Sequence, residues 1–199
     1  MNSVRLPTAY SLPSDGRMGG RIGKPAVVLD RDGVINEYRM HVNRPDDLHI
    51  YSYAAEAIGL LNKAGFYVLV ATNQGGIGLG YLSEADLAAI HERMQQELRE
   101  QGARIDGIAY CPHAPGARCP CRKPRPGMLY DLQRRYAFDF RRSYMVGDRE
   151  TDVACGRTVG MKTILIHEFP TQTAADYTAI DLLQAAKWIL TQTNGKFHT

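Results

Sequence analysis

The stretch AVVLDRDGVIN, residues 26–36, decides the fold, because it joins a short apolar run to two aspartates and a glycine. A short run of this kind, uninterrupted by polar residues, is typical of a parallel strand that is buried on both faces. The pattern recurs along the chain. We therefore predict five strands, at residues 26–30, 66–72, 107–111, 143–148 and 161–166.

Segments with the helical spacing of apolar residues separate these strands. Gly65 and Gly102 follow two of the segments and are residues that commonly end a helix. Ser83, with Asp86 three residues later, is a typical helix start. Strands that alternate with helices predict an α/β fold with a central parallel sheet. The predicted helices are residues 52–64, 83–101, 126–137, 150–159 and 179–190.

The length and composition limit the possible classes of protein. A chain of 199 residues predicts one domain, at roughly 150 residues per domain, and we place it at residues 25–192. Residues 1–24 are expected to be a flexible extension and residues 193–199 a tail. No apolar stretch is long enough to span a membrane, and a net charge of +3 without a basic stripe predicts no nucleic-acid partner. We expect a monomer that binds a small anionic substrate.

Aspartates follow two of the predicted strands at the edge where such sheets bind ligands. Asp30 and Asp32 follow the first strand, and Asp148 and Asp152 follow the fourth. Each acid alone is most simply a helix cap or a solvated turn residue. Together, converging carboxylates repel one another unless a cation lies between them. Hard oxygen ligands predict Mg²⁺.

Two further features suit a phosphate group. Thr72 offers a hydroxyl, and the loop Asn73-Gln-Gly-Gly-Ile-Gly78 offers backbone N–H groups before a helix. Lys123 lies in the segment CRKPRPGM, where prolines restrict the backbone and so limit the positions that the lysine can take. The alternative for this segment is a solvated basic loop.

Three cysteines and a histidine lie within one predicted loop. Cys111, His113, Cys119 and Cys121 form a Cys₃His set, which suits a closed, structural, tetrahedral Zn²⁺ site. The alternative is a group of reduced core cysteines beside a chance histidine. Residues 1–24 have no apolar stretch typical of a signal peptide, so we expect reduced cysteines and a cytoplasmic location. Cys155 is expected to be a buried apolar residue.

These groups resemble the four motifs of the haloacid dehalogenase (HAD) superfamily of aspartate-nucleophile phosphatases. The motifs are Asp30-Arg31-Asp32-Gly33, Thr72, Lys123 and Gly147-Asp148-Arg149-Glu150-Thr151-Asp152. The resemblance covers residues 26 to about 166 and implies the three-layer Rossmannoid HAD fold. No insertion long enough for a large cap follows the first or the third motif, so we expect little or no cap domain.

The resemblance also implies catalytic roles. Asp30 attacks phosphorus and becomes an aspartyl phosphate, while Asp32 protonates the leaving oxygen and later accepts a proton from water. Thr72 and Lys123 hold the transferring phosphoryl oxygens.

The same resemblance implies the magnesium ligands. They are the Asp30 carboxylate, the Asp32 backbone carbonyl and Asp148. Asp152 is expected to orient metal-bound waters or Lys123.

The cysteine loop narrows the resemblance to the zinc-containing HAD phosphatases that act on D-glycero-D-manno-heptose 1,7-bisphosphate or on histidinol phosphate. The motifs CPHAPG and CPCRKPRPGM, from residue 111 onward, favour the heptose substrate. The short spacing between His113 and Cys119, and Leu79 where many heptose enzymes have arginine, keep histidinol phosphate open as the alternative. A third possibility is a binding module on an inactive phosphatase scaffold. The residues expected to contact substrate are Asn73, Arg122, Arg125 and Arg149.

Overall fold

A computed structural model describes residues 23–38 and 42–193 of the chain. Nearly all of the predicted N-terminal extension, residues 1–22, and most of the predicted tail, residues 194–199, lie outside the described residues. The segment at residues 39–41 lies outside them as well.

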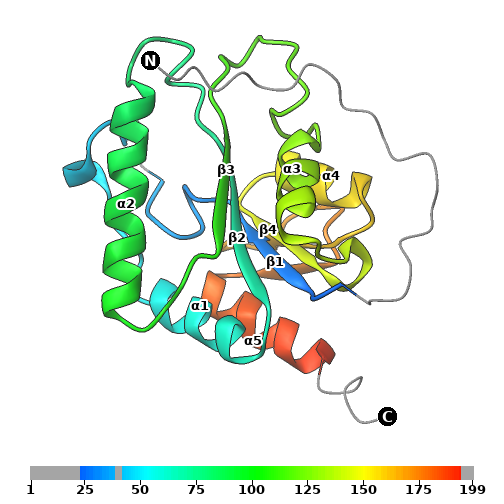
Figure 1. The fold of residues 1–199 in the computed structure, drawn as a ribbon. Coiled ribbons are helices and arrows are strands. Elements are labelled where there is room, and N and C mark those ends of the chain that lie inside the picture. The colour runs from blue at the N-terminus through cyan, green and yellow to red at the C-terminus, as the bar shows by residue number, and fades with distance from the viewer. Residues whose placement is uncertain (1–22, 39–41, 194–199) are drawn as a thin grey trace.

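One parallel six-stranded sheet forms the centre of the structure (Figure 1). Its strand order is β3-β2-β1-β4-β5-β6, so the first strand lies in the interior and is flanked by β2 and β4. The predicted α/β fold with a central parallel sheet is confirmed. The strands are β1 (Ala26–Leu29), β2 (Tyr67–Asn73), β3 (Gly107–Cys111), β4 (Tyr144–Gly147), β5 (Lys162–Ile166) and β6 (Tyr177–Ala179).

Helices cover both faces of the sheet and give the three layers that the resemblance implied. Figure 1 shows α2 on one side of the sheet and α3 and α4 on the other. The buried apolar residues accordingly form two clusters, one on each face. The helices are α1 (Ala54–Lys63), α2 (Glu84–Glu100), α3 (Gly127–Tyr136), α4 (Glu150–Thr158) and α5 (Leu182–Thr193).

Strand β1 is buried on both faces of the sheet, which explains why its sequence is apolar throughout. Val27 and Leu29 belong to the core on the face of α1, α2 and α5, whereas Ala26 and Val28 belong to the core on the face of α3. Alternate side chains of a strand point to opposite faces, so a strand between two helical layers needs apolar residues at every position.

The end of the chain differs from the prediction of a helix at residues 179–190. Residues Tyr177–Ala179 form a sixth strand that pairs with β5, and the last helix runs from Leu182 to Thr193. Asp181 explains the later start, because its Oδ1 accepts a hydrogen bond from the Gln184 backbone N–H at 2.7 Å, the bond that an N-cap makes. Thr193, predicted to lie in the tail, is the last residue of this helix.

The connections above the carboxyl edge of the sheet contain no inserted domain among the described residues. Residues 30–38 and 42–53 contain one helical element, the short 3-10 turn Pro45–Asp47, and residues 112–126 contain the cysteine loop. The expectation of little or no cap is confirmed. Within the described ranges, none of the helices combines the length and the apolar composition that a membrane crossing requires.

Candidate active site and metal-binding loop

The predicted aspartates meet where the strand order reverses. The chain passes from β1 to β2 and β3 on one side, and then to β4 on the other side of β1. This is the point at which open α/β sheets bind their ligands. Asp30 directly follows β1, and its backbone N–H donates to the Val146 carbonyl of β4 at 2.9 Å. The two strand ends are thereby held side by side.

Three carboxylates converge at this point. One oxygen from each of Asp30, Asp148 and Asp152 lies within 4.8 Å of the others. Two glycines make the approach possible. A Cβ on Gly147 would overlap the Asp152 side chain, and a Cβ on Gly33 would lie 2.5 Å from Asp148 Oδ2. Gly33 also has a φ of 81°, a conformation that glycine adopts readily.

Lys123 is the buried cation of this cluster. Its Nζ lies 2.9 Å from Asp30 Oδ2 and 2.5 Å from Asp152 Oδ1, and it donates to the Ala71 carbonyl at 2.7 Å. The three partners match the three N–H bonds of an ammonium group. Although burial opposes its charge, the two carboxylates raise the pKa of Lys123 above its ordinary value, so it stays protonated.

The remaining negative charge fits a divalent cation. Lys123 balances one of the three carboxylates. Burial, followed by the charge of Asp30, raises the pKa of Asp148 to about 6, and burial is also the largest cause that raises the pKa of Asp152. Asp148 Oδ1 is buried without a hydrogen-bond partner among the described residues. An unpaired oxygen in a set of hard oxygen donors suits Mg²⁺, so the residues present fit the predicted ion.

Thr72 and Asn73, at the end of β2, border the same cluster. Thr72 is buried, and its hydroxyl oxygen accepts from Gln74 Nε2 at 2.8 Å. This leaves the hydroxyl proton able to donate to a ligand. Asn73 Oδ1 accepts from the Lys123 N–H at 3.0 Å, and Asn73 Nδ2 donates to the Lys123 carbonyl at 3.2 Å. The sequence predicts that Asn73 contacts substrate. In the structure, its side-chain amide binds the backbone of Lys123 on both sides.

The Asp32 carboxylate does not join the acid cluster. Arg31 binds it through Nε to Oδ1 at 3.1 Å and through Nη2 to both oxygens, at 2.8 and 2.9 Å. Asn36 and Gln74 each donate one further hydrogen bond to it. Although burial opposes its charge, the Arg31 guanidinium and these hydrogen bonds hold the pKa of Asp32 below its ordinary value.

The three candidate arginines occupy different places. Arg122 Nη1 donates to the His113 carbonyl at 3.2 Å, and Arg125 Nη1 donates to the Cys119 carbonyl at 2.9 Å, so both contact the cysteine loop. Arg149 is exposed, with Nε 3.8 Å from Asp148 Oδ2 and its guanidinium 4.9 Å from the centre of the Tyr38 ring.

A cavity of about 220 Å³ opens beside these groups. Its lining includes Asp32, Tyr38, Asn43, Asn73 and Gly75. Its walls carry polar groups suited to a hydroxylated ligand.

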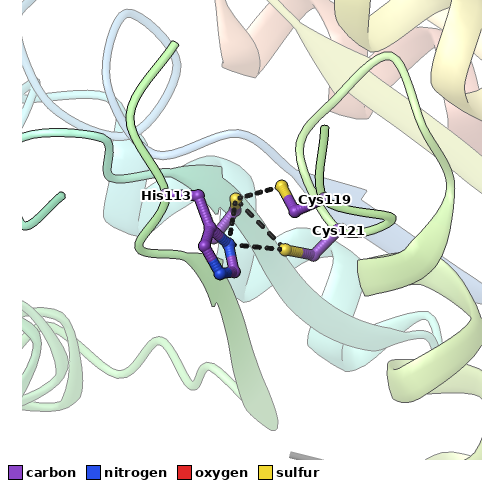
Figure 2. Close-up of side chains that lie close together, drawn as sticks. His113, Cys119 and Cys121 are labelled. Atoms are coloured by element: carbon purple, nitrogen blue, oxygen red, sulfur yellow. Dashed lines mark hydrogen bonds between the residues drawn. The ribbon is translucent and has the colours of Figure 1, made fainter. Parts of the chain in front are cut away.

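The predicted zinc ligands lie together at the end of β3, which supplies Cys111, and in the loop that follows it. Figure 2 shows the His113, Cys119 and Cys121 side chains pointing toward one another. Cys111 Sγ lies 3.5 Å from His113 Nδ1, 3.5 Å from Cys119 Sγ and 3.2 Å from Cys121 Sγ. Zn–S bonds of about 2.3 Å in a tetrahedron place neighbouring sulfurs roughly 3.8 Å apart. The four atoms are thus spaced for one Zn²⁺ ion, and the residues fit the predicted metal.

The sequence reasoning missed three buried polar residues behind Asp32. Arg31 is 1% exposed and His91, on α2, is 7% exposed, with Arg31 Nη1 3.4 Å from His91 Nε2. Gln74 donates from the same Nε2 to Asp32 and to Thr72. The available signal for His91 was its position between Leu87 and Met94 on the apolar face of the helix, where a polar residue needs a partner.

Comparison with known proteins places these observations in a family. The HAD-hydrolase-like family model matches residues 120–179. A D-glycero-β-D-manno-heptose-1,7-bisphosphate 7-phosphatase of Rhodopseudomonas palustris is 42% identical over 145 residues, which cover 69% of this chain and 81% of that protein. The enzyme of the same name from Pseudomonas aeruginosa is 39% identical, over 73% of this chain and 82% of that protein.

Solved structures agree with this similarity. A D,D-heptose 1,7-bisphosphate phosphatase from B. bronchiseptica, crystallised with magnesium and phosphate, superposes with a TM-score of 0.77 and is 33% identical. The match covers 85% of this chain and 99% of that one. A putative HAD-like phosphatase from Mesorhizobium loti gives a TM-score of 0.71 at 34% identity, over 87% of this chain and 92% of that one.

Replacing one thiol tests the zinc loop. We expect Cys119→Ser to lower the zinc content well below one ion per chain, measured by inductively coupled plasma mass spectrometry. The melting temperature should fall by roughly 5–10 °C, which corresponds to a loss of about 2.5 kcal/mol at about 2–4 °C per kcal/mol in a chain of this size. Cys155→Ser is the matched control, because Cys155 is a buried free thiol outside the loop and its loss should leave the zinc content unchanged. Unchanged zinc content in Cys119→Ser would contradict the site.

His91 gives a prediction for acid stability. Burial, followed by the charge of Arg31, lowers the pKa of His91 to about 4. The unfolded chain therefore binds a proton that the folded chain does not, and stability falls as the pH drops from about 6.5 toward 4. Between pH 7 and pH 5 we expect wild type to lose about 2 kcal/mol more than His91→Leu, at 1.36 kcal/mol per pH unit. Urea denaturation at both pH values measures the difference, and replacement of the exposed His49 by glutamine should leave it unchanged.

Proposed function

This chain belongs to the HAD-like hydrolases, and we propose that it removes the 7-phosphate of D-glycero-D-manno-heptose 1,7-bisphosphate, whose β anomer the relatives' names specify. The observation that carries the proposal is the cluster of Asp30, Asp148 and Asp152 around Lys123 at the end of β1 and β4. It supplies a buried nucleophile and a cation site in one place.

The proposed reaction has two steps. An Asp30 carboxylate oxygen bonds to phosphorus while the P–O bond to the sugar breaks, and the leaving oxygen takes a proton from Asp32. Because Arg31 keeps Asp32 ionised in the free protein, Asp32 first takes this proton from the bound phosphate monoanion. Water then attacks the aspartyl phosphate and gives a proton to Asp32, and inorganic phosphate leaves with Asp30 regenerated. Two steps with a carboxylate nucleophile replace one difficult displacement by water.

The neighbouring groups are proposed to hold the phosphoryl group. The Thr72 hydroxyl and the Lys123 ammonium donate to its oxygens, and Asp152 keeps Lys123 charged and in place. Asp30, the Asp32 carbonyl and Asp148 would hold Mg²⁺, which supplies charge stabilisation for the phosphoryl oxygens when bound.

The second phosphate needs a cation on the far side of the cavity. Among the candidate arginines, Arg122 is the best placed, because a Cβ on the cavity residue Gly75 would lie 3.0 Å from Arg122 Nη1. Arg149 lies beside Tyr38, which lines the cavity. Arg125, bonded to the Cys119 carbonyl, is proposed to brace the cysteine loop, which carries Zn²⁺ and holds Arg122 and Lys123 in position.

We infer further that the enzyme acts in the cytoplasm and as a monomer. Four unpaired thiols, three of them ligands for a metal, support a reducing compartment. All of the proposed catalytic groups come from one chain, so a second copy is not needed to complete the site.

Substitution of the nucleophile tests the covalent mechanism. Asp30→Asn should lower turnover with Mg²⁺ by at least about 10³-fold while the far-ultraviolet circular dichroism spectrum stays that of wild type, because an amide cannot form the acyl phosphate. Asp131→Asn, a change of the same kind on α3, should retain wild-type turnover. Wild-type turnover by Asp30→Asn at saturating substrate would rule out the mechanism.

A comparison of two substrates tests the assignment. We expect kcat/KM for the heptose bisphosphate to exceed that for histidinol phosphate by about 10²-fold or more, because only the bisphosphate can pair with a second cation. Phosphate release from both purified compounds measures the ratio. Arg122→Met should raise KM for the bisphosphate far more than for a monophosphate. A preference for histidinol phosphate would overturn the proposal.

A further inference from the structure

A buried arginine holds the side chain of the proposed general acid. Arg31 is 1% exposed, and its Nε and Nη2 bind both oxygens of Asp32 at 2.8–3.1 Å. A two-pronged contact of this kind fixes the orientation of a carboxylate as well as its position. Any shift of the guanidinium therefore moves the Asp32 carboxylate with it.

The other end of the guanidinium is held by His91 on α2. Arg31 Nη1 lies 3.4 Å from His91 Nε2, the one acceptor within hydrogen-bond distance of Nη1 in the described part of the chain. A guanidinium has only donors, so Nε2 must accept and the imidazole must be neutral, with its proton on Nδ1. The lowered pKa of His91 agrees with this protonation state.

Loss of this acceptor would leave a buried N–H bond of a charged group unpaired. The cost of removing such a group from water is then not compensated by a hydrogen bond, so the group moves toward another acceptor. Gln74 Oε1, 3.4 Å from Arg31 Nη2, is the neighbouring acceptor, and Gln74 also donates to Asp32 and Thr72. A shifted guanidinium therefore disturbs the hydrogen bonds that orient Asp32.

We propose that His91 is a positioning residue for the reaction, which accepts a hydrogen bond from Arg31 and thereby fixes the Asp32 carboxylate where it passes a proton to the leaving alcohol. This inference rests on the proposed function. His91 does not line the cavity beside Asp32, so it acts through Arg31 and not by contact with the substrate.

The alternative is a packing role alone. The His91 ring lies 6.2 Å from the ring of Tyr110, between the helix and β3, and filling this space contributes to stability whatever the ring bonds to. A packing role predicts equal effects on all substrates. A positioning role predicts effects only where the leaving group needs a proton, and the choice of leaving group separates the two.

The test compares two phosphate esters with Mg²⁺ present. Glycerol 2-phosphate releases an alkoxide that needs the Asp32 proton, whereas p-nitrophenyl phosphate releases a phenolate that is stable without one. In His91→Leu we expect kcat/KM, which reports the steps through P–O cleavage, to fall about 10-fold for the alkyl ester and less than 2-fold for the aryl ester. A well-placed general acid typically contributes 10²–10⁴-fold, so partial misplacement removes a fraction of that.

Three further measurements make the result decisive. His91→Gln, which restores an acceptor, should recover the alkyl-ester activity to within about 3-fold of wild type, and the inhibition constant for inorganic phosphate should not change in either variant. Met94→Ala, a buried change on the same helix, should lower the stability of the protein and change kcat/KM for the two esters by the same factor. If His91→Leu fails to fold, His91→Met takes its place.

The outcomes separate the inference from the proposed function. Equal losses for the two esters in His91→Leu, or no recovery in His91→Gln, would overturn the positioning role. Wild-type protein that releases phosphate from neither ester nor from the heptose bisphosphate would overturn the proposed function and this inference together.

Discussion

Repulsion between buried carboxylates is the constraint on which the rest of the site depends. Asp30, Asp148 and Asp152 are brought within a few ångströms by two adjacent strand ends and the first turn of α4. Lys123 neutralises one charge. Burial, and after it the neighbouring carboxylates, raises the pKa values of Asp148 and Asp152. The fold holds these acids in place through its core, and a divalent cation removes the electrostatic penalty when it binds.

The elements that were predictable from sequence are those with a local cause. Buried strands such as β1 need apolar residues at every position, and ligand-binding acids of a parallel sheet follow the strands, so the amino-acid pattern alone is enough to place Asp30 and Asp148 at the same edge of the sheet. The strand β6 was missed because its three residues are identified only by their pairing with β5. Without that pairing, its last residue, Ala179, was predicted to begin the following helix.

The buried polar residues that hold the Asp32 side chain, directly or through Arg31, were beyond sequence reasoning for a different reason. Arg31, Gln74 and His91 come from three separate segments, and nothing local indicates that they meet. Arg122 and Arg125 were predicted to contact substrate because arginine binds phosphate, yet the sequence does not tell which guanidinium bonds to its own loop. Charge type is visible in a sequence, whereas the direction of a long side chain depends on tertiary packing.

The two hydrogen bonds between the Asn73 amide and the Lys123 backbone attach the lysine to the end of β2, although it belongs to a loop. The stretch between His113 and Cys119 takes no part in that attachment, and Pro115, Gly116 and Arg118 within it are exposed. Insertions and deletions over evolution can therefore accumulate in this stretch without displacing the lysine, and its length is a poor guide to which compound a related enzyme consumes.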